Sequence, residues 1–276
     1  MIRQPVLAIL LTLGLTGSAA AMDLPPQVYA PETTIDGVGQ GWYLRGDLGY
    51  TGWTSNDAPS YSYVTGAGPT YGNESFDDSR FGKHMSYGAG MGYQFNEFLR
   101  SDATLDFFSS DMTGSSNIAS PCAVSEVAGT SCGFTHSGDF KAIGALANLY
   151  ADLGTYAGIT PYVGGGAGVT HVSWSDITTN TYCVNGSASC SGDTYNSGTN
   201  AGLDSWRFTY ALMAGLSYDI TSNMKLDFGY RFSKIAGGDM FDYSAASKAL
   251  GATGAQATDE GLSRHEIRAG IRINTW

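Results

Sequence analysis

Apolar side chains occupy every second position of residues 206–219. The even positions, from Trp206 to Tyr218, are all apolar, whereas the odd positions include the charged residues Arg207 and Asp219. Successive side chains of an extended strand point to opposite faces, and a helix with 3.6 residues per turn cannot place every second residue on one side. The segment is therefore predicted to be a β-strand with one wholly apolar face.

The same alternation recurs along the chain. Residues 224–233 repeat it after a connection of four residues, 220–223, so these two segments are predicted to form a hairpin. The glycine content of residues 161–174 hides which face of that strand is apolar. Eight strands are predicted altogether, at about residues 42–51, 84–95, 99–107, 140–153, 161–174, 206–219, 224–233 and 262–274.

The connections between these strands alternate in length. Three are short, near Asn96, Gly158 and Ser222. Strands joined by alternately short and long connections are typical of outer-membrane barrels, where short turns face the periplasm and long loops face outside. The predicted fold is all-β, an eight-stranded antiparallel transmembrane β-barrel with four long extracellular loops. A soluble sandwich would explain the apolar faces, but neither the charged second face nor the loop lengths. The long loops are expected at about residues 54–82, 109–139, 175–204 and 235–261.

Composition and the first residues indicate where the chain resides. Residues 1–21 have a positive start, an apolar core and a small-residue cleavage site, which predicts a secretory signal peptide. Residues 22–41 contain three prolines and are expected to be a periplasmic N-terminal linker, leaving residues 42–276 as the outer-membrane barrel. The net charge of −11 argues against a nucleic-acid partner, because the phosphate backbone selects basic surfaces.

The face opposite the apolar one carries a balanced set of charges. An apolar face must contact lipid, so these charges are predicted to point into the lumen and to form ion pairs. An eight-stranded barrel is just wide enough for side chains to fill it, so the pairs are expected to plug the lumen; a narrow ion path through rearranged pairs is the alternative. The predicted lumen network consists of seven cations and seven anions: Arg45, Arg100, Arg207, Lys225, Arg231, Arg268, Arg272, Asp47, Asp102, Asp106, Asp152, Asp219, Asp227 and Glu266.

The remaining acidic residues are expected mainly in the long loops, so the surface facing outward is predicted to be acidic. Ordinary solvated loops are the simpler explanation of this charge. The alternatives are attraction to divalent cations bound to lipopolysaccharide, or to a basic surface of a host cell or phage. Outer-membrane lipids, lipopolysaccharide and such a surface ligand are therefore the partners expected from the residues.

Four cysteines fall in two of the predicted loops. An exported chain with an even cysteine count favours disulfides, and pairing within each loop, Cys122 with Cys132 and Cys183 with Cys190, is the simplest of three connectivities. There is no CxxC motif, so no metal site is expected, and no cofactor either.

Enzymatic chemistry has one candidate arrangement in the sequence. His and Ser share a face at Ser263/His265, His84/Ser86 and His171/Ser173, as a lipid-modifying barrel enzyme would require. A catalytic base needs an orienting acid on its own face, and Glu266 is predicted to point inward. We therefore predict that the chain is not an enzyme.

Several strand segments resemble a known family. Residues 41–50, 147–155, 160–164, 226–232 and 265–272 are similar to the small outer-membrane β-barrel proteins of alphaproteobacteria, porin-like surface antigens of the OmpA/OmpX-type barrel superfamily. The resemblance implies an eight-stranded barrel in the outer membrane of a Gram-negative bacterium. It also implies that barrel-assembly machinery reads a C-terminal aromatic residue; here that residue is Trp276, which is out of phase with Ile271 and Ile273.

Three functions remain open from the sequence. The leading hypothesis is a structural or surface-interaction role in the cell envelope, with the lumen plugged by ion pairs. The second is a narrow porin-like channel for ions or small solutes, and the third is a lipid-modifying barrel enzyme.

Overall fold

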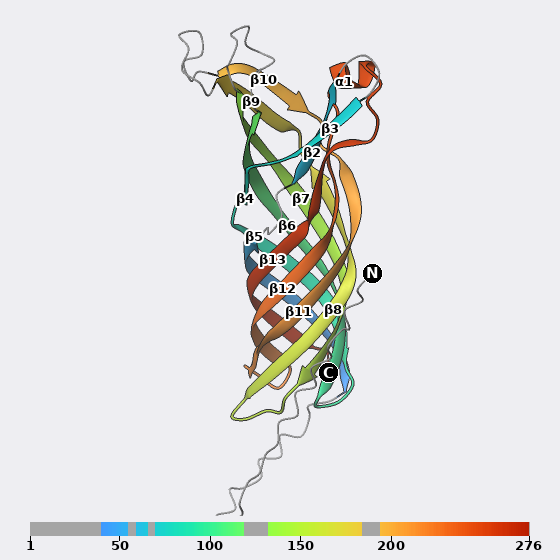
Figure 1. Ribbon diagram of the computed structural model, residues 1–276. Helices are drawn as coiled ribbons and strands as arrows, with labels where there is room; N and C mark the ends of the chain where they lie inside the picture. Colours follow the sequence, from blue (N-terminus) through green and yellow to red (C-terminus); the bar gives the residue numbers. More distant parts are fainter. Residues whose placement is uncertain (1–39, 55–58, 66–69, 119–131, 184–193, 276) are drawn as a thin grey trace, which may run out of the picture. The chain divides into compact units, whose positions relative to one another are not determined.

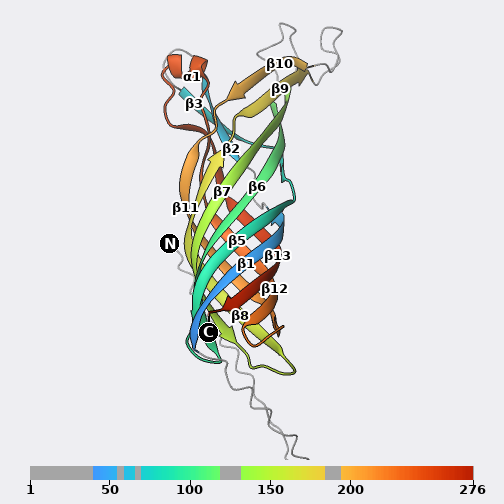
Figure 2. The same ribbon diagram turned by 180° about the vertical axis from the view of Figure 1, so that it is seen from behind.

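Eight antiparallel strands form a closed ring (Figures 1 and 2). The computed structural model describes residues 40–54, 59–65, 70–118, 132–183 and 194–275. The last strand returns to pair with the first, from Tyr43 opposite Asn274 to Thr54 opposite Ser263, so the ring has no open edge. This confirms the predicted eight-stranded barrel. Its strands are β1 (Gly41–Thr54), β5 (His84–Gln94), β6 (Leu99–Ile118), β7 (Cys132–Asp152), β8 (Ile159–Trp174), β11 (Asp204–Asp219), β12 (Met224–Asp242) and β13 (Ala255–Asn274).

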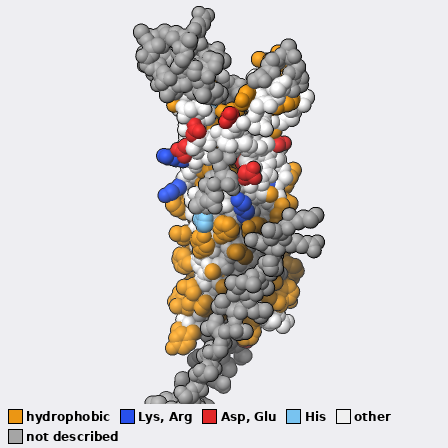
Figure 3. All heavy atoms as spheres, in the orientation of Figure 1, with side chains coloured by type: hydrophobic (Ala, Val, Ile, Leu, Met, Phe, Trp, Pro, Cys, Tyr) orange, Lys and Arg blue, Asp and Glu red, His pale blue; other side chains and the backbone are white. Residues whose placement is uncertain are grey.

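The outer surface of the barrel carries the apolar face of each strand. On β11, Trp206, Leu212 and Tyr218 are 70%, 59% and 51% exposed, whereas Arg207 and Thr209 are buried. Figure 3 shows hydrophobic side chains gathered over the half of the barrel that ends in the short turns, with charged side chains above them. In a bilayer, only a closed sheet can hydrogen-bond all of its backbone N–H and C=O groups. An apolar outer band around a polar interior is typical of such transmembrane barrels. The chain is therefore an integral protein of the Gram-negative outer membrane.

The facing of the glycine-rich strand β8 follows from the structure. Val163 and Val169 point outward, while Tyr162, Thr170 and Val172 are buried inside. A Cβ at Gly168 would lie 2.0 Å from the carbonyl oxygen of Ala145 on β7, so glycine at this position permits the close approach of two backbones.

Strand structure extends well beyond the apolar band, into much of each predicted long loop. β6 continues to Ile118 and β7 starts at Cys132, and β12 and β13 are extended in the same way. On these extensions the outward residues, such as Asp111 and Thr113, are polar, whereas the inward Phe108 and Met112 are buried. An apolar outer face identifies a membrane strand in the sequence, and the extensions lack this face because they lie outside the lipid.

Short elements complete the end of the barrel opposite the short turns. The only α-helix among the described residues has five residues, and no described helix is long and apolar enough to cross a membrane. The additional strands form a hairpin, a short pairing with β6 and a second hairpin that pairs with β7. These elements are β2 (Ser60–Thr65), β3 (Thr70–Ser75), β4 (Asp78–Phe81), β9 (Ile177–Cys183), β10 (Thr194–Asn200) and α1 (Ala245–Ala249).

Candidate functional site

The lumen within the apolar band is filled with charged side chains. Of the fourteen charged residues predicted there, thirteen are buried, with 0–9% of their surface exposed. The other, Asp219, lies at the periplasmic end, where its carboxylate accepts a bond of 2.5 Å from Lys225 Nζ and its side chain is 27% exposed. Buried charges are tolerated only when they are paired, so the contacts of each group decide whether this arrangement is stable.

Glu266 is the centre of the upper part of this network. Its Oε1 lies 2.5 Å from Arg264 Nη2, and its Oε2 lies 3.0 Å from Arg231 Nε. Arg268 Nε is 3.5 Å from Oε2, and the Ser86 hydroxyl donates to Oε1. One carboxylate therefore faces three guanidinium groups.

Asp106 balances two of these arginines, Arg231 and Arg268, from the opposite side. Its Oδ2 accepts from Arg231 Nη1 at 2.7 Å, and its Oδ1 accepts from Arg268 Nη2 at 2.6 Å. Arg268 Nη2 also lies 3.9 Å from Asp47 Oδ2, which connects this group to the one below. The charges around Glu266, Asp106 and Asp47 thus form a connected network rather than isolated pairs.

Arg45 links three strands in the middle of the lumen. Its guanidinium donates to Asp47 on its own strand at 2.8 Å and to Asp102 on β6 at 2.8 Å. It also donates to the Tyr150 hydroxyl at 3.0 Å, on β7. Asp102 accepts from Asn148 Nδ2 at 2.7 Å as well. Both carboxylate oxygens of Asp102 therefore accept hydrogen bonds.

Arg100 closes the periplasmic end of the network. Its Nε donates to Asp152 Oδ1 at 3.0 Å, and its guanidinium carbon lies 4.1 Å and 4.8 Å from the ring centroids of Tyr150 and Tyr162. Its two Nη atoms are buried without a hydrogen-bond partner among the described residues. The faces of the two rings stabilise this charge in place of acceptors. Nearby, Arg272 Nη2 lies 3.2 Å from Asp227 Oδ1.

Two members of the network were missed by the sequence analysis. Arg264 is 1% exposed and shares the inward face with Glu266, so strand parity could have found it. Asp259 bonds Arg207 Nη1 at 2.6 Å, but it lies in a segment predicted to be loop. Along β13 the buried residues have odd numbers before Gly261 and even numbers after it. Gly261 has a φ of +110°, which suits glycine. Strict alternation counted back from Glu266 would therefore place Asp259 on the outer face. With both included, eight cations balance eight anions.

The network leaves very little free space. One void of about 10 Å³ lies between Arg45, Tyr150 and Arg268, and a second of about 10 Å³ lies between Asp106, Thr170 and Arg264. A single water molecule needs about 10–15 Å³. Neither void could therefore hold a hydrated ion.

An apolar cluster lies directly above the charges. Phe140 is fully buried, with its ring centroid 4.9 Å from that of Trp174, 5.5 Å from that of Trp53 and 6.4 Å from that of Phe108. Arg264 joins the two layers, because its guanidinium carbon is 4.1 Å from the centroid of Phe108. We call this cluster the aromatic plug: Phe76, Phe108, Met112, Phe140, Ala142, Val172, Trp174, Ile177, Ile235, Met240, Phe241, Ala257 and Leu262, with Trp53, Tyr61 and Phe81 packed against it.

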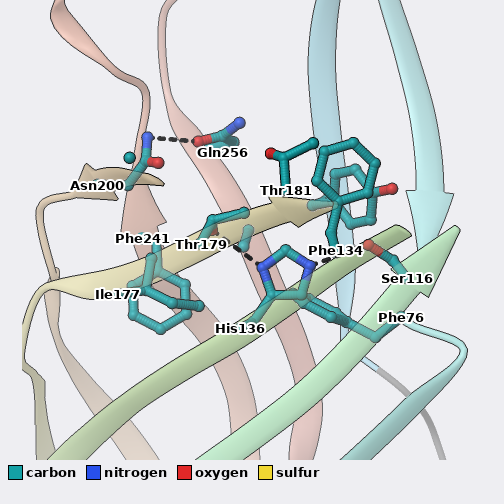
Figure 4. Close-up of a pocket in the computed structure, with 13 residues that line it drawn as sticks. Phe76, Ser116, Phe134, His136, Ile177, Thr179, Thr181, Asn200, Phe241 and Gln256 are labelled. Carbon is teal, nitrogen blue, oxygen red and sulfur yellow. Dashed lines mark hydrogen bonds between the residues drawn. The ribbon is translucent and has the colours of Figure 1, made fainter. Parts of the chain in front are cut away.

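A pocket of about 260 Å³ opens above the aromatic plug (Figure 4). His136 of β7 lies in its wall, with Nε2 2.9 Å from the Ser116 hydroxyl and Nδ1 3.0 Å from the Thr179 hydroxyl. Burial lowers the pKa of His136 to about 4, so its imidazole is neutral at neutral pH. No local pattern in the sequence indicates this pocket, because its lining comes from segments far apart in the chain.

Two of the four cysteines occupy paired backbone positions on neighbouring strands. The backbone register places Cys132 of β7 opposite Cys183 of β9, while Cys122 and Cys190 lie outside the described residues. The pairing of the four cysteines stays a prediction. The predicted signal peptide, the predicted linker up to residue 39 and Trp276 also lie outside the described residues.

The three His–Ser pairs have other partners. His265 Nδ1 lies 2.5 Å from the Tyr230 hydroxyl, and Ser263 accepts from Lys234 Nζ at 3.2 Å. Ser86 donates to Glu266 in the lumen, and the His171 ring packs 4.8 Å from that of Trp206. Glu266 does point into the barrel, away from the face of His265. In the described part of the chain, no three His, Cys, Asp or Glu side chains are placed to hold a metal ion.

The chain is similar to several bacterial proteins. No family model matches the chain. An uncharacterized protein of Brucella abortus is 34% identical in an alignment that covers 92% of each chain. Among solved structures, neisserial surface protein A is 18% identical with a TM-score of 0.43, covering 86% of this chain and 99% of its own. The outer membrane protein OprG of Pseudomonas aeruginosa is 14% identical with a TM-score of 0.41, covering 85% and 97%. The chain belongs to the family of small outer-membrane β-barrel proteins that includes the Brucella relative.

Proposed function

We propose that the protein is a non-enzymatic, non-conducting barrel that anchors its extracellular end at the cell surface, in a structural or surface-interaction role. The observation that carries this proposal is the double closure of the lumen. The paired charges fill the barrel within the apolar band, and the aromatic plug fills it above. A solute would have to pass both layers.

Moving the charged layer aside is energetically costly. Arg231 and Arg268 each contact both Asp106 and Glu266, so displacing either arginine separates two ion pairs at once. Separating buried partners leaves charges without compensation, which is strongly unfavourable in a medium of low dielectric constant. The network therefore acts as a fixed filling of the barrel.

A narrow porin-like channel is the second candidate. Two small voids lie within the network, and both touch Arg231. Rotation of that side chain could join them into a longer path for single water molecules or protons. This path would still meet the aromatic plug, with Phe140 in its centre.

The expected partners follow from the placement in the membrane. The apolar band contacts outer-membrane lipids and the acyl chains of lipopolysaccharide, and barrel-assembly machinery would insert the chain. The extracellular end would meet a host or phage surface.

Electrical conductance in planar lipid bilayers tests the proposal. We expect the purified protein, inserted at physiological salt, to give no current above that of the bare bilayer, because both lumen layers are closed. A general porin inserted in the same bilayers serves as the control for reconstitution. Steady open-channel current from this protein would contradict the proposed function and favour the channel.

A further inference from the structure

The pocket above the aromatic plug has features of a built ligand site. We propose that it binds a small neutral aromatic molecule of two fused rings that carries a hydrogen-bonding group on one edge. The pocket is formed by β2, β6, β7, β9, β10, β12 and β13, together with Phe76. These elements are held together by the extended strands, so the pocket is part of the barrel rather than of a separate loop.

The size of the pocket limits the ligand. An engineered protein cavity of about 150 Å³ binds a single benzene ring. At about 260 Å³, this pocket is larger by more than half, so it accepts a second fused ring.

One side of the pocket is apolar. Phe76, Ile177 and Phe241 are 4%, 4% and 1% exposed and belong to the aromatic plug as well. The His136 ring lies beside them (Figure 4), and both of its nitrogens are within hydrogen-bond distance of Ser116 and Thr179. This side therefore offers ring faces and aliphatic groups, which suit a flat aromatic molecule.

The opposite side offers hydrogen-bonding groups that the protein does not use. Asn200 Nδ2 donates to Gln256 Oε1 at 2.8 Å and to the carbonyl oxygen of Asp242 at 3.0 Å. Gln256 Nε2, Asn200 Oδ1 and the Thr181 hydroxyl have no hydrogen-bond partner among the described residues. Figure 4 shows Asn200, Gln256 and Thr181 along one side and His136, Ile177 and Phe241 along the other. A ligand between the two sides would pack its rings against the apolar side and form hydrogen bonds from its polar edge to the other side.

The lining carries no charge, in a chain whose net charge is −11. None of the lining residues is Asp, Glu, Lys or Arg, and the imidazole of His136 is neutral. A charged ligand would lose its hydration without gaining a partner, so the site selects neutral molecules. The aromatic plug closes the pocket from below, which makes this a binding site rather than the mouth of a passage.

Titration with 1-naphthol tests the proposal, with folded protein in detergent micelles and protein-free micelles as the blank. We expect saturable binding of one molecule per chain. The anion 1-naphthoate has the same rings but a charge, and we expect it to bind at least about tenfold more weakly, since nothing compensates a buried charge.

Variants separate the pocket from the lipid-facing surface. Ala257→Leu fills the pocket and should abolish saturable binding, and Gln256→Leu removes one donor and should weaken it about five- to tenfold. Thr199→Val, on the exposed side of β10, is the matched control and should change nothing. Each variant is first shown to fold by its heat-dependent gel mobility.

Three results would overturn the proposal. The first is the absence of saturable naphthol binding, and the second is binding that folded Ala257→Leu and Gln256→Leu both retain. The third is tighter binding of a neutral sugar such as methyl glucoside than of naphthol. None of these results bears on the conductance of the lumen, so the proposed function is tested separately.

Discussion

Replacing Glu266 by glutamine is expected to lower the free energy of unfolding by about 3–5 kcal/mol. Glutamine keeps the shape of the side chain but removes the charge that faces Arg231, Arg264 and Arg268. Asp106 bonds two of these arginines, whereas the only carboxylate that bonds Arg264 among the described residues is Glu266. The variant therefore leaves a guanidinium group buried without a counter-charge.

Urea unfolding of the protein folded into lipid vesicles measures this effect. The matched control is Asp242→Asn, which removes the carboxylate of the more exposed pair with Lys248 and should cost at most about 1 kcal/mol. Adding Arg264→Met to Glu266→Gln restores the balance of charge and should recover part of the loss. Equal, small losses in Glu266→Gln and the control would show that the buried charges are not energetically coupled.

Phe140→Ala is expected to destabilise the barrel by about 3–5 kcal/mol. Phe140 is fully buried and contacts Trp53, Phe108 and Trp174, so its removal leaves a cavity in the aromatic plug that these large rings cannot readily fill. The plug holds the strand extensions together above the membrane. We therefore expect the loss to appear in the same urea unfolding experiment.

Phe208→Ala on β11 is the matched control for this prediction. Phe208 is 58% exposed and faces lipid, so shortening it creates no cavity, because acyl chains close around the smaller side chain. Its loss should be smaller than that of Phe140→Ala. A Phe140→Ala variant as stable as Phe208→Ala would contradict the role of the plug. The variant should also stay non-conducting, because the charge network below Phe140 remains closed.

Strand alternation made the barrel predictable from sequence. Arg207 and Asp227 lie on one face of the sheet, so residues on the other face, such as Trp206 and Leu212, must face lipid. The alternation of residue types therefore predicts a closed sheet with its apolar face outward. Arg264 obeys the same parity as Glu266 and could have been found. Asp259 could not, because the change of phase near Gly261 is a backbone property that residue types alone do not reveal.

The alternation of apolar and polar residues could not predict the structure of the extracellular end. Above the lipid the pattern inverts, with Phe108 and Met112 inside and Asp111 outside, so the rule that identifies a membrane strand excludes these segments. The pocket depends on contacts between residues as distant as Tyr61, His136 and Gln256, which no local pattern brings together. Local periodicity thus defines the barrel, whereas its contents above the membrane depend on tertiary packing.

Gel mobility before and after heating tests the closed barrel most directly. In sodium dodecyl sulfate without heating, a closed and internally paired barrel should stay folded and migrate faster than the heated, unfolded chain. Glu266→Gln should make the same conversion at a lower temperature. If unheated and heated wild-type protein migrated identically, the chain would not be a stable closed barrel, and its lumen would not be filled by paired charges.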